Sequence, residues 1–154
     1  MRRPLLLHPV LLIGLGTWAL NDHVLKAAFA AGWTGKLSDV ASLIAFPLLA
    51  AGAFELCTRR GLGRAELPVV AFWSAATGFV MATINTLPDA AWAYRHGLGL
   101  AQWLALGAQG TPHTVRLTVD PTDLWTLPAL AVPLALAWLR RPPASEGRPV
   151  AAPA

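Results

Sequence analysis

The chain has 154 residues, of which 55% are hydrophobic and only 13% are charged, and its formal net charge is +4. A soluble domain carries about 25% charged residues, so the composition argues against a soluble protein and favours one with a lipid-facing surface. Because the arginines lie beside apolar runs, we interpret the positive charge as a membrane-topology signal and expect no nucleic-acid partner. The single cysteine, Cys57, excludes an intramolecular disulfide and a cysteine-based metal cluster.

The first apolar run covers residues 4–20 and follows a start that carries two arginines. A basic start before an apolar run is also typical of a signal peptide, but no small-residue cleavage site with a polar region behind it follows. We therefore predict a retained first membrane span over about 4–20. Beyond it, apolar residues recur at helical spacing toward Gly32, and Asp22 and Lys26 stand four residues apart. The helix is thus expected to continue past the membrane surface and to carry an ion pair there.

The second and third spans are predicted over about 40–57 and 68–87. Ser38 or Asp39 is placed to cap the N-terminus of the second span, where a carboxylate also meets the positive end of the helix dipole. Pro47 should kink this span, a defect that neighbouring helices can accommodate.

A row of small residues marks one side of the third span: Ser74, Gly78 and Ala82 follow one another at four-residue intervals. Such a row favours close contact between membrane helices. Asn85 lies on the neighbouring stripe and is expected to face protein rather than lipid.

The region 88–121 is the one long stretch between spans, and its apolar part, 98–108, has about eleven residues and is too short to cross. A fifth span over 90–109 would bury Arg95 and His96 in lipid. We therefore prefer an interfacial or re-entrant helix at the outer surface.

The fourth span is predicted over about 122–139 and begins at Asp120-Pro121-Thr122-Asp123, a strong helix start with an Asp cap and Pro at the first position. Just before it, apolar and polar residues alternate over 115–119, which is typical of a short strand. The tail, 142–154, is proline- and alanine-rich and is expected to be disordered. The fold class is thus an all-α membrane protein: one four-helix transmembrane domain over 1–141 with an additional outer-surface helix.

The distribution of basic residues predicts the orientation of the four spans. One set of alternate loops and ends holds eight of them, and the opposite set holds four: Arg2, Arg3, Arg59, Arg60, Arg64, Arg140, Arg141 and Arg148 against Lys26, Lys36, Arg95 and Arg116. Because basic residues favour the cytoplasmic side, both termini are expected in the cytoplasm.

This topology places a set of polar residues together at the outer ends of the helices. The candidate cluster comprises Asp22, His23, Lys26, Lys36, Asp39, Asn85, Asp120 and Asp123. We expect Asp22–Lys26 and Lys36–Asp39 to face each other as a four-member charge network. Three interpretations compete: a structural network, a binding or catalytic site in which lysines hold phosphate and Asp or His acts as a base, and a divalent metal site. No HxxxH-type spacing fixes metal ligands on one helix face, so we predict no metal site. The sequence leaves open whether the protein binds a cofactor.

The motifs NDHVLK, TGKLSD and DPTDL resemble N-D-H-x-x-K, T-G-K-x-S-D and D-x-x-D-L in a family of small bacterial inner-membrane proteins of uncharacterised activity. The resemblance spans most of the chain and implies an inner-membrane location without implying an activity. A weaker likeness to VanZ-like membrane proteins rests on Lys and Asp near helix ends, although their full pattern is missing.

Three functions are compatible with these features. The favoured one is a structural or accessory protein that works through membrane partners or as a homo-oligomer in the lipid bilayer. The alternative is an enzyme or binding protein for envelope lipid or glycan intermediates at the outer leaflet. A small transporter is the least favoured, because no acid or base is placed clearly in the middle of a span.

Overall fold

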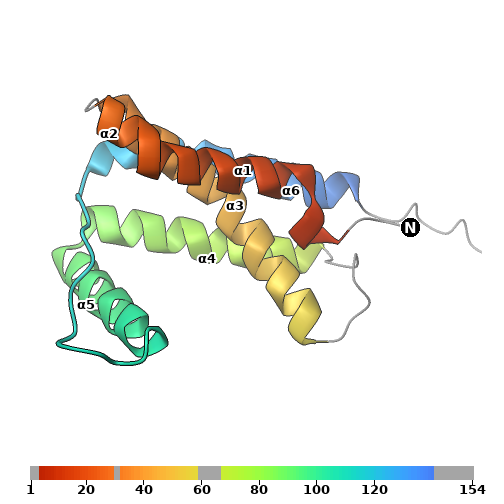
Figure 1. The fold of residues 1–154 in the computed structure, drawn as a ribbon. Coiled ribbons are helices and arrows are strands. Elements are labelled where there is room, and N and C mark those ends of the chain that lie inside the picture. Colours follow the sequence, from red (N-terminus) through yellow and green to blue (C-terminus); the bar gives the residue numbers. More distant parts are fainter. Residues whose placement is uncertain (1–3, 30–31, 59–66, 141–154) are drawn as a thin grey trace, which may run out of the picture.

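The structure, a computed structural model, describes residues 4–29, 32–58 and 67–140, and all regular structure within them is helical (Figure 1). The elements in chain order are η1 (Leu5–Leu7), α1 (Pro9–Leu20), η2 (Asn21–Leu25), α2 (Lys26–Ala28), α3 (Gly32–Cys57), α4 (Leu67–Thr86), α5 (Pro88–Ala105), η3 (Pro121–Leu130) and α6 (Ala131–Leu139). The prediction of an all-helical protein is confirmed for these residues, and the predicted tail, 142–154, lies outside them.

Three stretches are long and apolar enough to cross a membrane: Gly32–Cys57, Leu67–Thr86 and Pro121–Leu139, the last formed by η3 and α6 together. They coincide with the second, third and fourth predicted spans. The first of the three has 26 residues, a length of about 39 Å at 1.5 Å per residue. This is longer than the hydrocarbon core of a bilayer, which is about 30 Å thick. The N-terminal turns of α3 are the polar ones.

The N-terminal helix continues past Leu20, as predicted. Helical backbone runs without interruption from Pro9 to Ala28, through the π-helical turn η2 and the short α2, and ends where Phe29 becomes extended. The π-turn holds the bond from the Lys26 N–H to the Asn21 carbonyl. The helix thus ends about one turn before Gly32, the residue near which it was expected to stop.

The helices pack around α3, which lies against α1, α4 and η3. The buried apolar core comes from η1, α1, α3, α4 and α6: Leu5, Leu11, Ala45, Leu48, Ala51, Val70 and Ala137. Small residues permit the close approaches. A Cβ at Gly14 would lie 3.3 Å from the Ala45 Cβ, and one at Gly78 would lie 2.8 Å from Leu130 Cδ1. Gly78, the middle residue of the predicted row on α4, therefore packs against η3.

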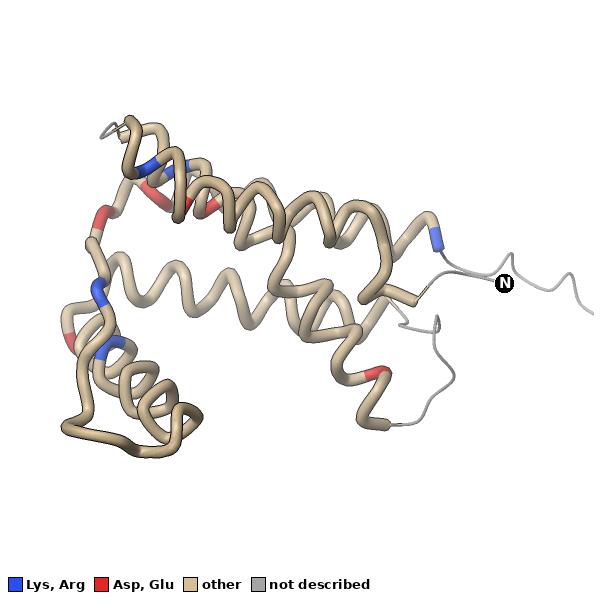
Figure 2. Tube along the Cα trace, viewed as in Figure 1, with Lys and Arg blue, Asp and Glu red and all other residues tan. Residues whose placement is uncertain are grey.

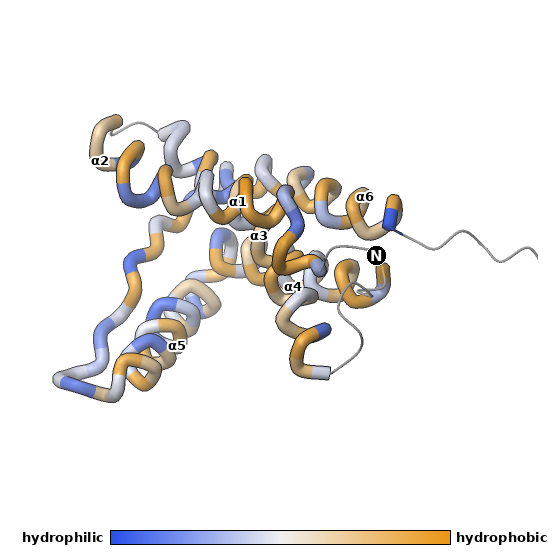
Figure 3. Tube along the Cα trace, turned by 45° about the vertical axis from the view of Figure 1, so that its right-hand side comes forward, coloured by the Kyte–Doolittle hydropathy of each residue, from blue (hydrophilic) through white to orange (hydrophobic). Residues whose placement is uncertain are grey.

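The outward surface of the bundle is strongly apolar. Figure 3 shows hydrophobic residues along most of α1, α3, α4 and α6. Large side chains stand exposed there, among them Phe72 at 65% and Phe79 at 70% on α4. In a bilayer, such a surface is surrounded by lipid that is as apolar as the helices themselves. Association of the helices therefore depends on close packing and on interhelical hydrogen bonds.

Helix α5 projects away from the bundle and is followed by a segment, 106–120, that runs back along it (Figure 1). The strand predicted over 115–119 is wrong: this stretch has no regular structure. The Val115 N–H donates to the Arg95 carbonyl at 3.1 Å, and Arg95 Nη2 donates to the Leu117 carbonyl at 2.8 Å. A strand needs a second strand to pair with its backbone N–H and carbonyl groups. Here Arg95 on α5 bonds to one N–H and one carbonyl of the segment instead.

Charged residues gather at one end of the bundle, where η2, the first turns of α3 and the start of η3 meet (Figure 2). We call this the charged end.

Candidate functional site

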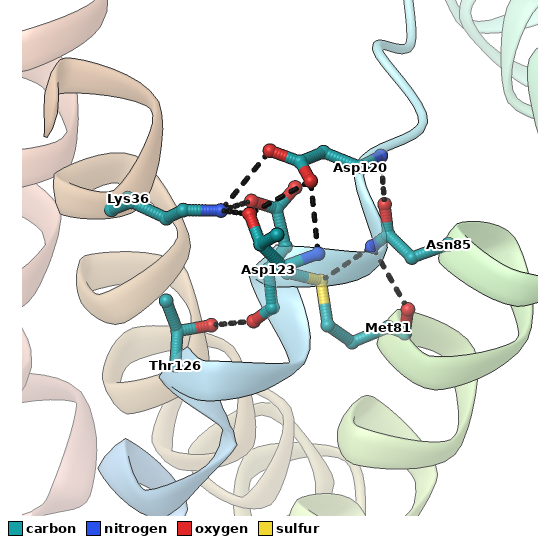
Figure 4. Close-up of polar contacts among 7 residues, drawn as sticks. Lys36, Met81, Asn85, Asp120, Asp123 and Thr126 are labelled. Atoms are coloured by element: carbon teal, nitrogen blue, oxygen red, sulfur yellow. Dashed lines mark hydrogen bonds and ion pairs between the residues drawn. The ribbon is translucent and has the colours of Figure 1, made fainter. Parts of the chain in front are cut away.

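Lys36, in the second turn of α3, reaches across to the start of η3 (Figure 4). Its ammonium group donates to Asp120 Oδ2 at 3.2 Å, to Thr122 Oγ1 at 2.6 Å and to Asp123 Oδ1. An ammonium group has three N–H donors, so each has an acceptor. We call these four residues the Lys36 clamp. The predicted Lys36–Asp39 pair is wrong, because the start of η3 offers Lys36 two carboxylates and a hydroxyl at once.

The start of η3 is built as the sequence predicts. Asp120 is the N-cap, and its Oδ1 accepts from the Thr122 N–H at 2.9 Å and from the Thr122 hydroxyl at 2.7 Å. Hydrogen bonds from the Thr122 hydroxyl and N–H, and then from Lys36, lower the pKa of Asp120. The cap therefore holds a carboxylate in place for the clamp.

Asn85 ties this cap to the end of α4. Its Oδ1 accepts from the Asp120 N–H at 3.0 Å, and its Nδ2 donates to the Met81 carbonyl at 3.0 Å (Figure 4). The residue is 2% exposed, so the prediction that it faces protein is confirmed. Through this contact, α4 and η3 are held together at the charged end.

A second group of polar residues joins the N-terminal helix to α3; we call Asn21, Asp22, Lys26 and Ser38 the Ser38 network. Asn21 is fully buried, and its Nδ2 donates to the Thr34 carbonyl at 2.6 Å and to Ser38 Oγ at 2.7 Å. The Ser38 hydroxyl donates in turn to Asp22 Oδ1 at 2.5 Å. Three buried or partly buried hydrogen bonds thus link the N-terminal helix to α3.

Asp22 is the acceptor on which the Ser38 network converges. Lys26 Nζ lies 2.7 Å from Asp22 Oδ1, which confirms the predicted i,i+4 pair. Burial acts to raise the pKa of Asp22, but hydrogen bonds from Lys26 and Ser38 and the Lys26 charge outweigh it, and the pKa is lowered.

Both helical segments that flank the start of α3 depart from α-helical geometry. The turn Asn21–Leu25 is a π-helix, and Pro121–Leu130 is a 3₁₀-helix of ten residues. Runs of 3₁₀-helix beyond three or four residues are uncommon, and single π-turns occur frequently at functional sites. Neither helix type was predictable from the sequence, because capping residues and apolar periodicity do not distinguish α-, π- and 3₁₀-helices.

Asp39 is partly buried on α3, where the charges of Asp123 on η3 and of Lys36 both act on its carboxyl group. Asp39 is therefore linked to the clamp electrostatically.

His23 is exposed on η2 and takes part in neither polar group. The structure brings the other seven predicted residues together as two neighbouring sets on either side of α3. Within the described residues, no three His, Cys, Asp or Glu side chains are arranged to hold a metal ion.

The sequence interpretation missed Asn21, whose position at the end of an apolar run was the available signal, and Thr122. Ser38 was predicted as a helix cap, and the structure gives it two further partners, Asn21 and Asp22. No family model, curated protein or solved structure matches this chain. The site's chemistry therefore has to be inferred from its own geometry.

Proposed function

We propose that this chain is a multi-pass integral membrane protein with a structural or accessory role, and that its charged end fixes helix ends in register. The observation that carries the proposal is the saturation of Lys36: all three ammonium donors have acceptors within the chain. A lysine that binds a ligand phosphate needs an ammonium N–H that is not already bonded to an acceptor in the protein.

The proposed topology has four spans, with residues 4–20 as the first, both termini in the cytoplasm of a bacterium and the charged end at the outer face of the inner membrane. The apolar helix Pro9–Leu20, with the turn Leu5–Leu7 before it, supports the first span, and the helix continues beyond that span to Ala28. The excess of arginine on one set of loops supports the orientation.

For α5 we propose an interfacial or re-entrant position. The excursion between α4 and η3 leaves from and returns to the same end of the bundle, because the Asn85 side chain at the end of α4 holds the Asp120 N–H at the start of η3. A single crossing by α5 does not fit that arrangement. Arg95, bound to the returning segment, and the 63% exposed Trp92 suit a membrane surface.

The proposed structural role is tested by neutralising the Lys36 clamp. Lys36→Met leaves two carboxylates without their cation and should lower the thermal stability of the purified protein. Adding Asp120→Asn and Asp123→Asn removes those orphaned charges and should recover much of the stability. The matched control is Lys26→Met, which removes a lysine from a more exposed pair and should have the smaller effect.

The same variants separate a clamp from a ligand site. In a strain that lacks the gene, the triple variant at matched abundance should replace the wild-type protein if the charges only hold helices together. A stable, abundant triple variant that fails to replace it would refute the structural role.

A second function, catalysis or binding of envelope lipid or glycan intermediates at the outer leaflet, is favoured by one pair of residues. Asp39 and Asp123 are two carboxyl groups that interact electrostatically, and such a pair can serve as a general acid and base. Asp39→Asn leaves the three acceptors of Lys36 in place. A stable Asp39→Asn variant that loses function would support this alternative over the structural role.

A transport function has the least support. Leu67–Thr86 carries no charged residue, and neither does the stretch 124–139, whereas ion and proton pathways through membrane proteins are marked by ionisable residues within spans.

A further inference from the structure

An apolar groove runs along the bundle surface between α1, α3 and α6. Its volume is about 210 Å³. Val10 and Thr17 form part of the α1 wall, Leu37, Val40 and Ile44 form part of the floor on α3, and Val132 comes from α6. Of all the side chains that line it, Thr17 alone is polar.

The shape of the groove suits one extended hydrocarbon chain. It follows α1 from Val10 to Thr17 and α3 from Leu37 to Ile44, which is two helical turns, or about 10 Å, on each. A helix from a partner has a diameter of about 10 Å with its side chains and would not enter a space of this volume. The occupant is therefore an acyl chain and not a second copy of the chain.

One end of the groove opens at the charged end. Leu37 on its floor directly follows Lys36, and Thr17 on its wall lies one turn before Asn21. A lipid whose acyl chain follows the groove toward the opposite membrane surface would have its headgroup beside the Lys36 clamp and the Ser38 network.

The charges at this end favour one kind of headgroup. The two polar sets hold four carboxyl groups, from Asp22, Asp39, Asp120 and Asp123, against two lysines, so acid is in excess and a purely anionic headgroup is repelled. Lys26, with a 42% exposed side chain, is paired only with Asp22 among the described residues, which leaves donors for a phosphate. A headgroup that carries both an amine and a phosphate fits this end, because the amine can approach the carboxyl groups and the phosphate can approach Lys26.

We propose that the groove between α1, α3 and α6 binds one acyl chain of a zwitterionic, amine-bearing phospholipid such as phosphatidylethanolamine, with the amine toward the carboxylates and the phosphate toward Lys26. The proposal rests on the membrane embedding proposed above but not on the role of the Lys36 clamp. It gives the accessory protein a lipid ligand.

The test is native mass spectrometry of the delipidated full chain in detergent. The protein is titrated with phosphatidylethanolamine or with phosphatidylglycerol of identical acyl chains. We expect a single phosphatidylethanolamine to bind about tenfold more tightly than phosphatidylglycerol, a difference of about 1.4 kcal/mol. Equal binding of the two lipids, or tighter binding of phosphatidylglycerol, would overturn the headgroup assignment.

The groove itself is tested by filling it. Val40→Phe on the floor should weaken phosphatidylethanolamine binding about tenfold, whereas Val80→Phe, the same substitution at a 42% exposed position on α4 outside the groove, should leave it unchanged. Val132→Phe, on the opposite wall and 40% exposed, replaces Val40→Phe if that variant unfolds. Equal weakening by the groove variants and by Val80→Phe, or no weakening by any of them, would overturn the groove as the binding site.

The lipid contact of Lys26 is tested by Lys26→Gln, which should reduce phosphatidylethanolamine binding while the groove stays intact. Unchanged binding would overturn the phosphate contact. Failure of these lipid experiments is distinguishable from failure of the proposed structural role, because the latter is measured by the stability of Lys36 clamp variants without added lipid.

Discussion

Replacement of Asn21 by alanine tests whether buried hydrogen bonds hold the N-terminal helix against α3. The amide is fully buried and donates twice across the helix interface, to the Thr34 carbonyl and to Ser38 Oγ. Asn21→Ala removes both bonds, while the Ser38 hydroxyl keeps its own bond to Asp22.

The magnitude follows from these contacts. A hydrogen bond between protein groups contributes about 1 kcal/mol in water, and interhelical hydrogen bonds in a membrane protein average about 0.6 kcal/mol. Two bonds thus give about 1–2 kcal/mol, and the truncated side chain adds the loss of its packing contacts. Against this stands Asn21 Oδ1, which is buried without a partner among the described residues and whose removal is favourable. We expect a net loss of about 1–2 kcal/mol in the free energy of unfolding.

The assay is equilibrium unfolding in detergent micelles, with Leu20→Ala as the control. Leu20 precedes Asn21 on the same helix but is 53% exposed, so its truncation should change the free energy by less than about 0.5 kcal/mol. A double-mutant cycle with Ser38→Ala should give a coupling of about 0.5–1.5 kcal/mol. Zero coupling, with Asn21→Ala as stable as Leu20→Ala, would refute the assignment of stability to this interface.

Three further predictions follow from the structure. Gly99→Ala should release the segment after α5, because the new Cβ would lie 1.9 Å from the backbone oxygen of His113. Gly97→Ala is the control, since its Cβ meets nothing within 4 Å. Hydrogen exchange over 88–120 should rise in the Gly99 variant alone, and equal exchange in both variants would contradict the close packing. The lowered pKa values of Asp22 and Asp120 add stability that is present above their ordinary value of 3.8 and is lost as pH falls below it through the folded-state values; acid unfolding should be steeper in the wild-type protein than in the variant with both residues changed to Asn, and identical profiles would contradict the pKa directions. A reporter active only in the periplasm should be silent at the C-terminus and active in the loop after α5; the reverse pattern would refute the proposed orientation.

The sequence by itself determined where the helices lie and how some of them begin. Three predicted spans coincide with helices of sufficient length and hydropathy, because a helix satisfies its own backbone and the bilayer sets the apolar length it must have. The Asp120 cap and the Asp22–Lys26 pair were also predictable. Each depends on contacts within four residues, which the order of amino acids fixes directly.

Only the tertiary structure decided which polar residues face one another. Lys36 was expected beside Asp39, three residues away, yet its partners Asp120 and Asp123 lie 84 and 87 residues along the chain. Helices that are apolar on all sides do not reveal from periodicity which face meets protein, because lipid and protein present similar apolar surfaces. Their rotation is fixed by small residues, by the wide turn at Asn21–Leu25 and by the long 3₁₀-helix before α6. These features turn Lys36 toward η3 and Ser38 toward Asn21, and the polar pairing follows from that packing.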